Sequence, residues 1–316
     1  MRYRRLGASG VRVSEVALGG WLTQGRSIDD QSTATIVRRA FDLGINFFDT
    51  ADVYNNGEAE KSLAKAIKEF RRIDLFIATK CYFPMSDRPN DQGLSRKHIQ
   101  ESVHDSLRRL ETDTIDLMQF HRFDPHTPLE ESIRAVTDLI AQGKVHYGGV
   151  SLWSAAQISE AVHLARHMNV PAPVSNQPKF NMFDRSIEQE VLPTCDRLGL
   201  GQVVFSPLAQ GVLTGKYRPG QPVPAGSRGA DPSSNTWMGH DLREESLRRV
   251  VALEAVARDY DLTVGQFALA WCLRHPGVNS VIVGATRTEQ IEENARAGTA
   301  ELPAEAWDRA EAILTA

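Results

Sequence analysis

Four titratable side chains follow short apolar runs in which the sequence predicts buried strands. In a barrel of parallel strands the carboxyl ends meet at one face, where barrel enzymes hold their catalytic groups. We therefore expect these four side chains to form one site. They are Asp49 and Tyr54 after residues 45–48, Lys80 after residues 75–79, and His121 after residues 115–120.

Tyr54 and Lys80 together indicate proton transfer. A free tyrosine, with a pKa of about 10, is a weak proton donor at neutral pH. An ammonium about 4 Å away would stabilise the phenolate by roughly 4 kcal/mol at an effective dielectric constant of about 20, so Lys80 should lower the pKa of Tyr54. Asp49 would hold Lys80 charged, and His121 would donate a hydrogen bond to a substrate oxygen. Each residue alone has a structural alternative, such as helix capping for Asp49, and only their joint placement favours catalysis.

The composition is that of an ordinary globular protein. The chain has 316 residues, is 41% hydrophobic and carries a net charge of -4, which argues against nucleic-acid binding. The charged start lacks the apolar stretch of a secretory signal, and no window approaches the length of a membrane span. Three widely spaced cysteines, Cys81, Cys195 and Cys272, favour a reducing cytoplasm over a disulfide framework or a zinc cluster.

Strand-like and helix-like segments alternate along the chain. Residues 3–6 and 11–13 flank a glycine turn and predict a β-hairpin that plugs one end of a barrel. Eight strand–helix units in this length predict a (β/α)8 TIM barrel with an extra C-terminal helix, in a single domain over residues 1–316. A doubly wound sheet is the alternative. The expected barrel strands are 16–19, 45–48, 75–79, 115–120, 145–151, 173–176, 202–205 and 278–283, and the expected helices are 30–43, 58–70, 96–110, 128–141, 154–168, 187–198, 242–260, 264–273, 289–297 and 304–314.

Two places in the sequence are suited to phosphate groups, although no G-x-G-x-x-G follows a strand. At residues 284–290 a strand ends and a helix begins with Arg287 at the junction, and free N–H groups at helix starts bind anions. The alternative there is an ordinary capping box of Thr286 and Glu289. The second place is the glycine-containing stretch after Ser206, inside an irregular segment that reaches about residue 240.

Several motifs together resemble the aldo-keto reductases along essentially the whole chain. The resemblance implies NADPH-dependent reduction of aldehydes and ketones, with Tyr54 as the acid, Lys80 tuning its pKa, Asp49 as partner of Lys80, and His121 orienting the carbonyl. The segments that carry it are 44–54, 78–80, 119–122, 148–151, 205–208, 215–217 and 288–294, and segments 93–99 and 270–274 resemble the branch that contains the potassium-channel β-subunits and their bacterial relatives.

The same resemblance implies an NADPH or NADP+ molecule extended across the barrel mouth. Phe205 would stack on the nicotinamide, and Ser151 and Gln177 would bind its carboxamide. Thr286 and Arg287 would bind the 2′-phosphate. The other residues expected to bind the cofactor are Gly20, Trp21, Asp49, Ser206, Pro207, Leu208, Ala209, Gln210, Gly211, Lys216 and Arg228, with Gln290, Glu293 and Asn294 at the adenosine end.

The expected contact with the nicotinamide carboxamide departs from the family pattern at one position. Leu152 stands where much of the family has Asn and the channel subunits have Arg, whereas His121 stands where some channel subunits have Asn, which favours a working enzyme over a sensor.

The expected partner is a small carbonyl compound, apolar or aromatic, with no metal, nucleic acid or membrane, and a homo-oligomer is compatible with the sequence. Rival functions are a slowly turning NADPH-binding regulatory subunit and an aldolase with Lys80 as Schiff-base nucleophile. Candidate pocket walls, each of which could instead belong to the core, are Trp21, Tyr82, Phe83, Trp153 and Trp237.

Overall fold

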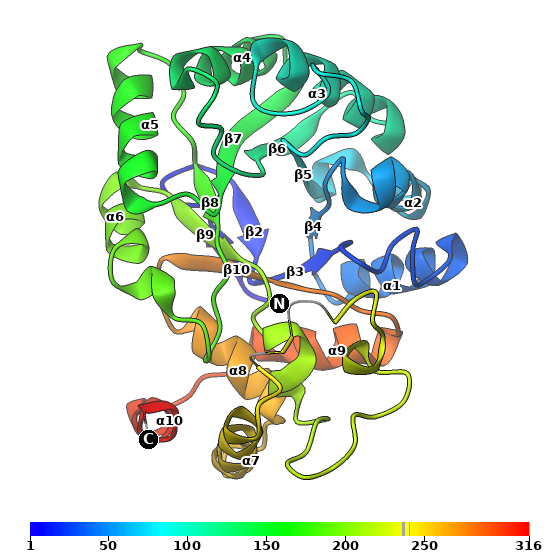
Figure 1. Ribbon diagram of the computed structural model, residues 1–316, viewed down its shortest axis with the longest axis vertical. Coiled ribbons are helices and arrows are strands. Elements are labelled where there is room, and N and C mark those ends of the chain that lie inside the picture. The colour runs from blue at the N-terminus through cyan, green and yellow to red at the C-terminus, as the bar shows by residue number, and fades with distance from the viewer. Residues whose placement is uncertain (236–237, 240, 316) are drawn as a thin grey trace.

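The computed structural model describes residues 1–235, 238–239 and 241–315 and is a closed barrel of parallel strands inside a ring of helices (Figure 1). Each barrel strand pairs with the next one along the chain, and the last strand closes the barrel against the first. The predicted (β/α)8 TIM barrel is confirmed, and a doubly wound sheet is excluded because such a sheet is open. The barrel strands are β3 (Val16–Gly19), β4 (Phe47–Asp49), β5 (Phe76–Cys81), β6 (Ile115–Phe120), β7 (Val145–Ser151), β8 (Ser175–Gln177), β9 (Gly201–Val204) and β10 (Val278–Val283).

The helices that follow the strands turn their apolar stripes toward the barrel. Two further helices, α7 (Glu244–Arg258) and α10 (Ala304–Thr315), pack on each other outside the ring, at the bottom of Figure 1. The expected extra C-terminal helix is thus confirmed. None of the helices in the described part of the chain has the length and apolar character needed to cross a bilayer. The ring helices are α1 (Asp30–Asp42), α2 (Glu58–Ile67), α3 (Arg96–Leu110), α4 (Leu129–Ala141), α5 (Ala155–His167), α6 (Val191–Leu198), α8 (Val264–Leu273) and α9 (Thr288–Ala297), and the short 3-10 helices are η1 (Tyr54–Gly57), η2 (Arg72–Asp74), η3 (Ser186–Glu188), η4 (Ala209–Thr214) and η5 (Arg228–Ala230).

The segment predicted as one helix over residues 187–198 is divided in the structure. The 3-10 helix η3 ends at Glu188, and α6 begins only at Val191. The physical reason is Pro193, which has no N–H group and would clash with the preceding turn in the interior of a longer helix. In the first turn of α6 the same proline is tolerated, because the first amides of a helix have no intrahelical partner.

The N-terminal hairpin closes the end of the barrel at which the strands begin. β1 (Tyr3–Arg5) and β2 (Arg12–Ser14) pair antiparallel, and Leu6 packs in one cluster with Phe47, the first residue of β4. In the hairpin turn Gly7 has φ +56°, and a side chain there would lie 2.4 Å from the backbone oxygen of Gly199, in the turn that leads into β9. The predicted plug is therefore confirmed, and the site must use the opposite end.

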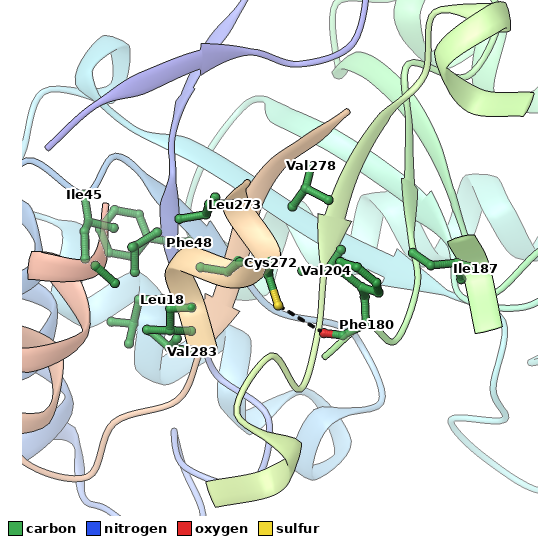
Figure 2. Close-up of a cluster of buried hydrophobic side chains, with 14 of the residues drawn as sticks. Leu18, Ile45, Phe48, Phe180, Ile187, Val204, Cys272, Leu273, Val278 and Val283 are labelled. Carbon is green, nitrogen blue, oxygen red and sulfur yellow. Dashed lines mark hydrogen bonds between the residues drawn. The ribbon is translucent and has the colours of Figure 1, made fainter. Parts of the chain in front are cut away.

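A second apolar layer fills the space between the barrel strands and the ring helices. Figure 2 shows part of this layer, where Cys272 and Leu273 of α8 lie among side chains from the barrel strands. The thiol of Cys272 donates to the carbonyl oxygen of Phe180 at 3.7 Å, and burial raises the pKa of this thiol. Cys272 therefore behaves as a small apolar residue that fixes α8 against the barrel.

Candidate active site

The alternation of side chains along neighbouring strands places polar groups at the mouth of the barrel. Every second residue of a strand points to the same face. On β5 the inner row runs from Phe76 through Ala78, which lie in the interior apolar cluster, to Lys80. The same alternation brings Asp49 on β4 and His121, just after β6, to the carboxyl-terminal end of the barrel.

Lys80 is the centre of this group. Its side chain is fully buried, and Nζ donates to Asp49 Oδ1 at 2.7 Å, to the carbonyl oxygen of Thr50 at 2.7 Å and to Tyr54 Oη at 3.1 Å. These contacts use the three hydrogens of an ammonium group. The second oxygen of Asp49 accepts from the side-chain amide of Gln177 at 2.8 Å, so the carboxylate is held from both sides.

The protonation states of Lys80 and Tyr54 follow from burial and from each other. Burial acts to lower the pKa of Lys80, but Asp49 and Tyr54 outweigh it and raise that pKa above its usual value, so the amine is charged at neutral pH. Burial raises the pKa of Tyr54, and the Lys80 ammonium opposes this without reversing it. Lys80 therefore acts on the pKa of the phenol in the predicted direction, but burial of the phenol outweighs it and leaves that pKa above its usual value. Tyr54 stays protonated at neutral pH, which is the form that a proton donor needs.

His121 completes the group as a neutral imidazole. Burial holds its pKa well below the usual value, and the charges of Lys80 and Arg122 lower it further. The ring makes edge-to-face contacts with the rings of Tyr54 and Phe83, at centroid distances of 5.8 Å and 4.9 Å. Nδ1 is buried without a hydrogen-bond partner among the residues that the structure describes. A neutral imidazole keeps one N–H, so His121 can donate to an oxygen placed beside Tyr54.

A buried polar network behind the site holds the loop that carries Tyr54, and no sequence pattern predicted it. Asp52 is fully buried, and its N–H donates to the carbonyl oxygen of Lys80 at 3.2 Å. Its carboxylate accepts from the N–H of Val53 at 2.6 Å and from Ser102 Oγ on α3 at 3.0 Å. The only sequence signal was a carboxylate among apolar residues two positions before Tyr54.

Asp52 also lies near a second buried carboxylate. Burial raises the pKa of Asp52 to about 7, and the charge of Glu60 raises it as well. Glu60 itself is fully buried and accepts from Arg109 Nε at 2.6 Å and from Thr79 Oγ1 at 2.6 Å. Because the folded state prefers the protonated acid, Asp52 contributes most to stability below about pH 4, and this contribution is lost as the pH rises to about 7.

This linkage predicts how Asp52→Asn changes stability. The free energy of unfolding of the variant minus that of wild type should be about 2 kcal/mol more positive at about pH 8 than at about pH 5. Wild type loses the contribution of protonated Asp52 over this range, whereas asparagine does not titrate. Urea unfolding at the two pH values measures the difference.

The matched control for this prediction is Asp124→Asn. Burial acts to raise the pKa of Asp124, but hydrogen bonds from the backbone of Leu94 and His126 outweigh it and lower that pKa. Both pH values lie above it, so the effect of Asp124→Asn should not change between them. If the effect of Asp52→Asn is equally constant, Asp52 is already charged at about pH 5.

The aromatic residues expected around the substrate fall into two groups. Trp21 is 38% exposed at the barrel mouth, and Tyr82 and Phe83 are half-buried with their rings in contact at 5.3 Å. Trp153 is only 2% exposed and packs against two phenylalanine rings, so of the two places that the sequence left open, the pocket wall and the core, it lies in the core. Trp237 lies outside the described residues.

Ser151 and Gln177 end the neighbouring strands β7 and β8. Ser151 Oγ donates to the backbone carbonyl oxygen of Gln177 at 2.9 Å, while the side-chain NH2 of Gln177 donates to Asp49. Leu152 follows with φ +57° and is 42% exposed. A bulky residue rarely adopts this conformation, which Asn tolerates. Backbone strain of this kind is found at functional sites.

The turn after β9 has an unusual backbone. Phe205 is half-buried against the interior cluster, and the turn then places Ser206, Ala209 and Gln210 at φ values of 52°, 47° and 57°. Successive N–H groups in such turns can face one anion. Lys216 lies close to this turn. Its Nζ would be 3.2 Å from a Cβ atom added to Gly211.

Farther along the same segment, Arg228 bridges to the other side of the barrel mouth. Its guanidinium lies over the ring of Trp21 at 4.9 Å, and Nε donates to the carbonyl oxygen of Ser234 at 3.0 Å. Burial lowers the pKa of Arg228 to about 10. Its Nη2 is buried and lacks a hydrogen-bond partner within the described residues. Gly20, beside Trp21, donates its N–H to the carbonyl oxygen of Asp49.

The start of α9 does not form the capping box of Thr286 and Glu289. Instead Gln290 Oε1 accepts from the N–H of Thr286 at 2.7 Å and from its hydroxyl at 3.2 Å, and the exposed Arg287 is the N-cap residue. Glu293 accepts from Thr263 Oγ1 at 2.8 Å, which ties α9 to α8. Asn294 is buried on the inner face of α9.

Comparison with known proteins agrees with this architecture. A model of the aldo/keto reductase family matches residues 15–315. A probable voltage-gated potassium channel subunit beta of Oryza sativa subsp. japonica is 42% identical over 300 residues, 94% of this chain and 91% of that protein. Similarly named proteins of Arabidopsis thaliana (43% over 300 residues; 94% and 91% of the two chains) and Schizosaccharomyces pombe (43% over 304 residues; 93% and 87%) are also similar. The chain belongs to the aldo/keto reductase family, and its branch with the channel β-subunits is the one that the sequence motifs indicated.

Proposed function

We propose that this protein reduces aldehydes and ketones to alcohols with NADPH, as one domain over residues 1–316. The observation that carries the proposal is the contact of one buried ammonium, Lys80 Nζ, with both Asp49 and Tyr54 Oη at the barrel mouth. A fully buried charge needs such partners to remain charged, and this placement beside a protonated phenol suits proton donation.

Each member of the group then has one task. NADPH, when bound, supplies a hydride to the carbonyl carbon. Tyr54 donates its proton to the carbonyl oxygen, and Lys80 stabilises the resulting phenolate. Asp49 keeps Lys80 charged and in place, and the neutral His121 orients the carbonyl oxygen through its N–H.

The polar groups along the mouth fit the dinucleotide. The residues that would border the nicotinamide are Phe205, Ser151 and Gln177. The side-chain NH2 of Gln177 donates to Asp49, so Gln177 would accept a hydrogen bond through its side-chain oxygen. The unpaired Nη2 of Arg228, within the part that the structure describes, is a buried donor suited to a phosphate oxygen. The remaining residues that would hold the cofactor are Gly20 and Trp21 at the nicotinamide end, Ser206, Pro207, Leu208, Ala209, Gln210, Gly211 and Lys216 along the pyrophosphate, and Thr286, Arg287, Gln290, Glu293 and Asn294 at the adenosine end.

Different observations bear on the two rival functions, a Schiff-base aldolase and a regulatory subunit. A Schiff-base aldolase needs a neutral amine, whereas Asp49 and Tyr54 hold Lys80 charged. A slowly turning NADPH-binding regulatory subunit is favoured by the names of the relatives, which are channel β-subunits. We also propose a reducing, cytoplasmic setting, since Cys81, Cys195 and Cys272 are buried free thiols.

A panel of carbonyl compounds tests the proposed function. NADPH oxidation should depend on the added aldehyde or ketone and yield the alcohol, with aromatic aldehydes among the better substrates because Trp21, Tyr82 and Phe83 line the mouth. Cofactor without carbonyl compound is the control. Tight NADPH binding without turnover of any compound in the panel would favour the regulatory alternative, and a protein that co-purifies would support it.

The choice between NADPH and NADH supplies a separate prediction. Arg287→Ala should raise the Kd for NADPH about ten- to a hundredfold and leave the Kd for NADH nearly unchanged. The 2′-phosphate that NADH lacks would meet this guanidinium and the first N–H groups of α9, and losing one charge-assisted hydrogen bond costs roughly 1.5–3 kcal/mol. Fluorescence titration of both cofactors measures the effect.

The matched control is Arg296→Ala, an exposed arginine in the last turn of the same helix. It removes the same charge from α9 at the end where no phosphate is expected, so both cofactors should bind as in wild type. Equal weakening of NADPH and NADH by Arg287→Ala would assign Arg287 to folding or to the pyrophosphate.

A further inference from the structure

A second cation borders the reacting groups. Arg122 follows His121 directly and is half-buried at the barrel mouth. Its guanidinium lies over the ring of Phe83 at 5.1 Å, and the Phe83 ring contacts His121 at 4.9 Å. The phenol of Tyr54 contacts the same imidazole. The charge of Arg122 also acts on the phenol of Tyr54 and on the imidazole of His121, so the guanidinium lies near the groups between which a substrate oxygen would lie.

Arg122 lacks an acidic partner within the part of the chain that the structure describes. There its hydrogen bond is from Nη1 to the carbonyl oxygen of its neighbour His121, at 2.5 Å. Among the described residues, no carboxylate oxygen lies within 4.0 Å of it, whereas Arg72 and Arg109, which are also partly buried, each have a carboxylate at 2.6 Å. Arg228 is a second partly buried arginine of the barrel mouth with no carboxylate within 4.0 Å among the described residues, and we place it along the proposed cofactor path.

The charges around Arg122 leave it uncompensated. Lys80 and Asp49 neutralise each other through their 2.7 Å contact, and His121 is neutral. Burial lowers the pKa of Arg122, because its charge is held partly away from water. A guanidinium presents parallel N–H groups that match the two oxygens of a carboxylate, and such a pair becomes stronger where water is excluded.

We propose that Arg122 binds a carboxylate of the substrate, so that the preferred substrates carry an aldehyde or ketone and a carboxylate on one apolar or aromatic body. This inference rests on the proposed reductase function and adds a substrate class to it. The carboxylate would replace water at the free N–H groups of Arg122, while the carbonyl oxygen lies between Tyr54 and His121.

Two probes that differ in one charge test this assignment. 4-Carboxybenzaldehyde is an anion at neutral pH, and its methyl ester has nearly the same shape without the charge. We expect wild type to show a higher kcat/KM for the acid than for the ester. Arg122→Gln should lower the acid-to-ester ratio of kcat/KM about 10- to 100-fold, the scale of a charge-assisted hydrogen bond. Arg122→Lys should lie between, since it keeps the charge and loses the paired N–H groups.

Arg134→Gln is the matched control, because Arg134 is an exposed arginine on α4, outside the site, and should leave the ratio as in wild type. Thermal melting and NADPH titration check that each variant is folded. An unchanged ratio in Arg122→Gln overturns the proposal, including the case in which both probes slow equally and the pH profile shifts, which would assign Arg122 to the acidity of Tyr54. Wild type that reduces the ester without favouring the acid refutes this inference alone. Binding of NADPH with no turnover of any carbonyl compound removes the reductase function, and this inference with it.

Discussion

Tyr54→Phe should lower kcat by about 100-fold or more and leave the affinity for NADPH nearly unchanged. Proton donation by a positioned acid contributes about this much to rate, and phenylalanine keeps the ring while removing the hydroxyl that carries the proton. The rest of the site should persist, because Lys80 retains its contacts with Asp49 and Thr50 and the ring still packs against His121. The loss should therefore report on chemistry and not on folding.

The measurement is steady-state reduction with an isotope effect from deuterated NADPH, which shows whether hydride transfer limits the rate. Tyr147→Phe is the matched control, since it removes the same hydroxyl from a half-buried tyrosine of barrel strand β7 that packs against the interior apolar cluster. Because burial holds the pKa of Tyr54 above its usual value, the wild-type rate should be level through neutral pH and fall only in alkali. A Tyr54→Phe rate within a few-fold of wild type, with hydride transfer limiting, would remove Tyr54 from the mechanism.

The parts of the fold that the sequence predicted are those set by local periodicity. The strands β7 and β10 and the helices α3 and α8 have the predicted bounds. In α3 the buried apolar residues Ile99, Val103 and Leu110 recur with the period of a helix, whereas α8 and β10 are buried along their whole length. Reactive residues at the ends of apolar runs were informative for a related reason. A polar group that continues the inner row of a strand has nowhere to lie except the barrel mouth.

The parts that the sequence did not predict depend on tertiary surroundings. The pKa of Tyr54 depends on how completely the fold buries the phenol, and the residues next to Tyr54 in the sequence do not show this. Asp52 is ordinary in the sequence and becomes part of a buried network only because α3 brings Ser102 against it. Trp153 was ambiguous between pocket and core, since an aromatic residue after a strand suits both, and packing on two phenylalanine rings decided it.

Lys80→Met should lower kcat nearly as much as Tyr54→Phe, by about 100-fold. The ammonium donates to Tyr54 Oη and stabilises the phenolate that forms as the proton leaves. Without it the pKa of Tyr54 should rise further, so the alkaline fall in rate should move to higher pH. Because both residues act on one proton, the double variant should be little slower than either single variant. Losses that multiply in the double variant would show that the two residues act independently.

Lys80→Met carries a structural risk that a second variant separates from the catalytic effect. Removing one partner of a buried ion pair costs about 3–5 kcal/mol, because it leaves the other charge uncompensated. Asp49→Asn combined with Lys80→Met removes both charges, and Gln177 can still donate to the remaining side-chain oxygen. Urea unfolding should show that this pair recovers much of the stability that Lys80→Met loses, while kcat stays low because Tyr54 still lacks its ammonium. If kcat recovers together with stability, Lys80 serves only to hold the fold, and the proton-donor role of Tyr54 does not depend on it.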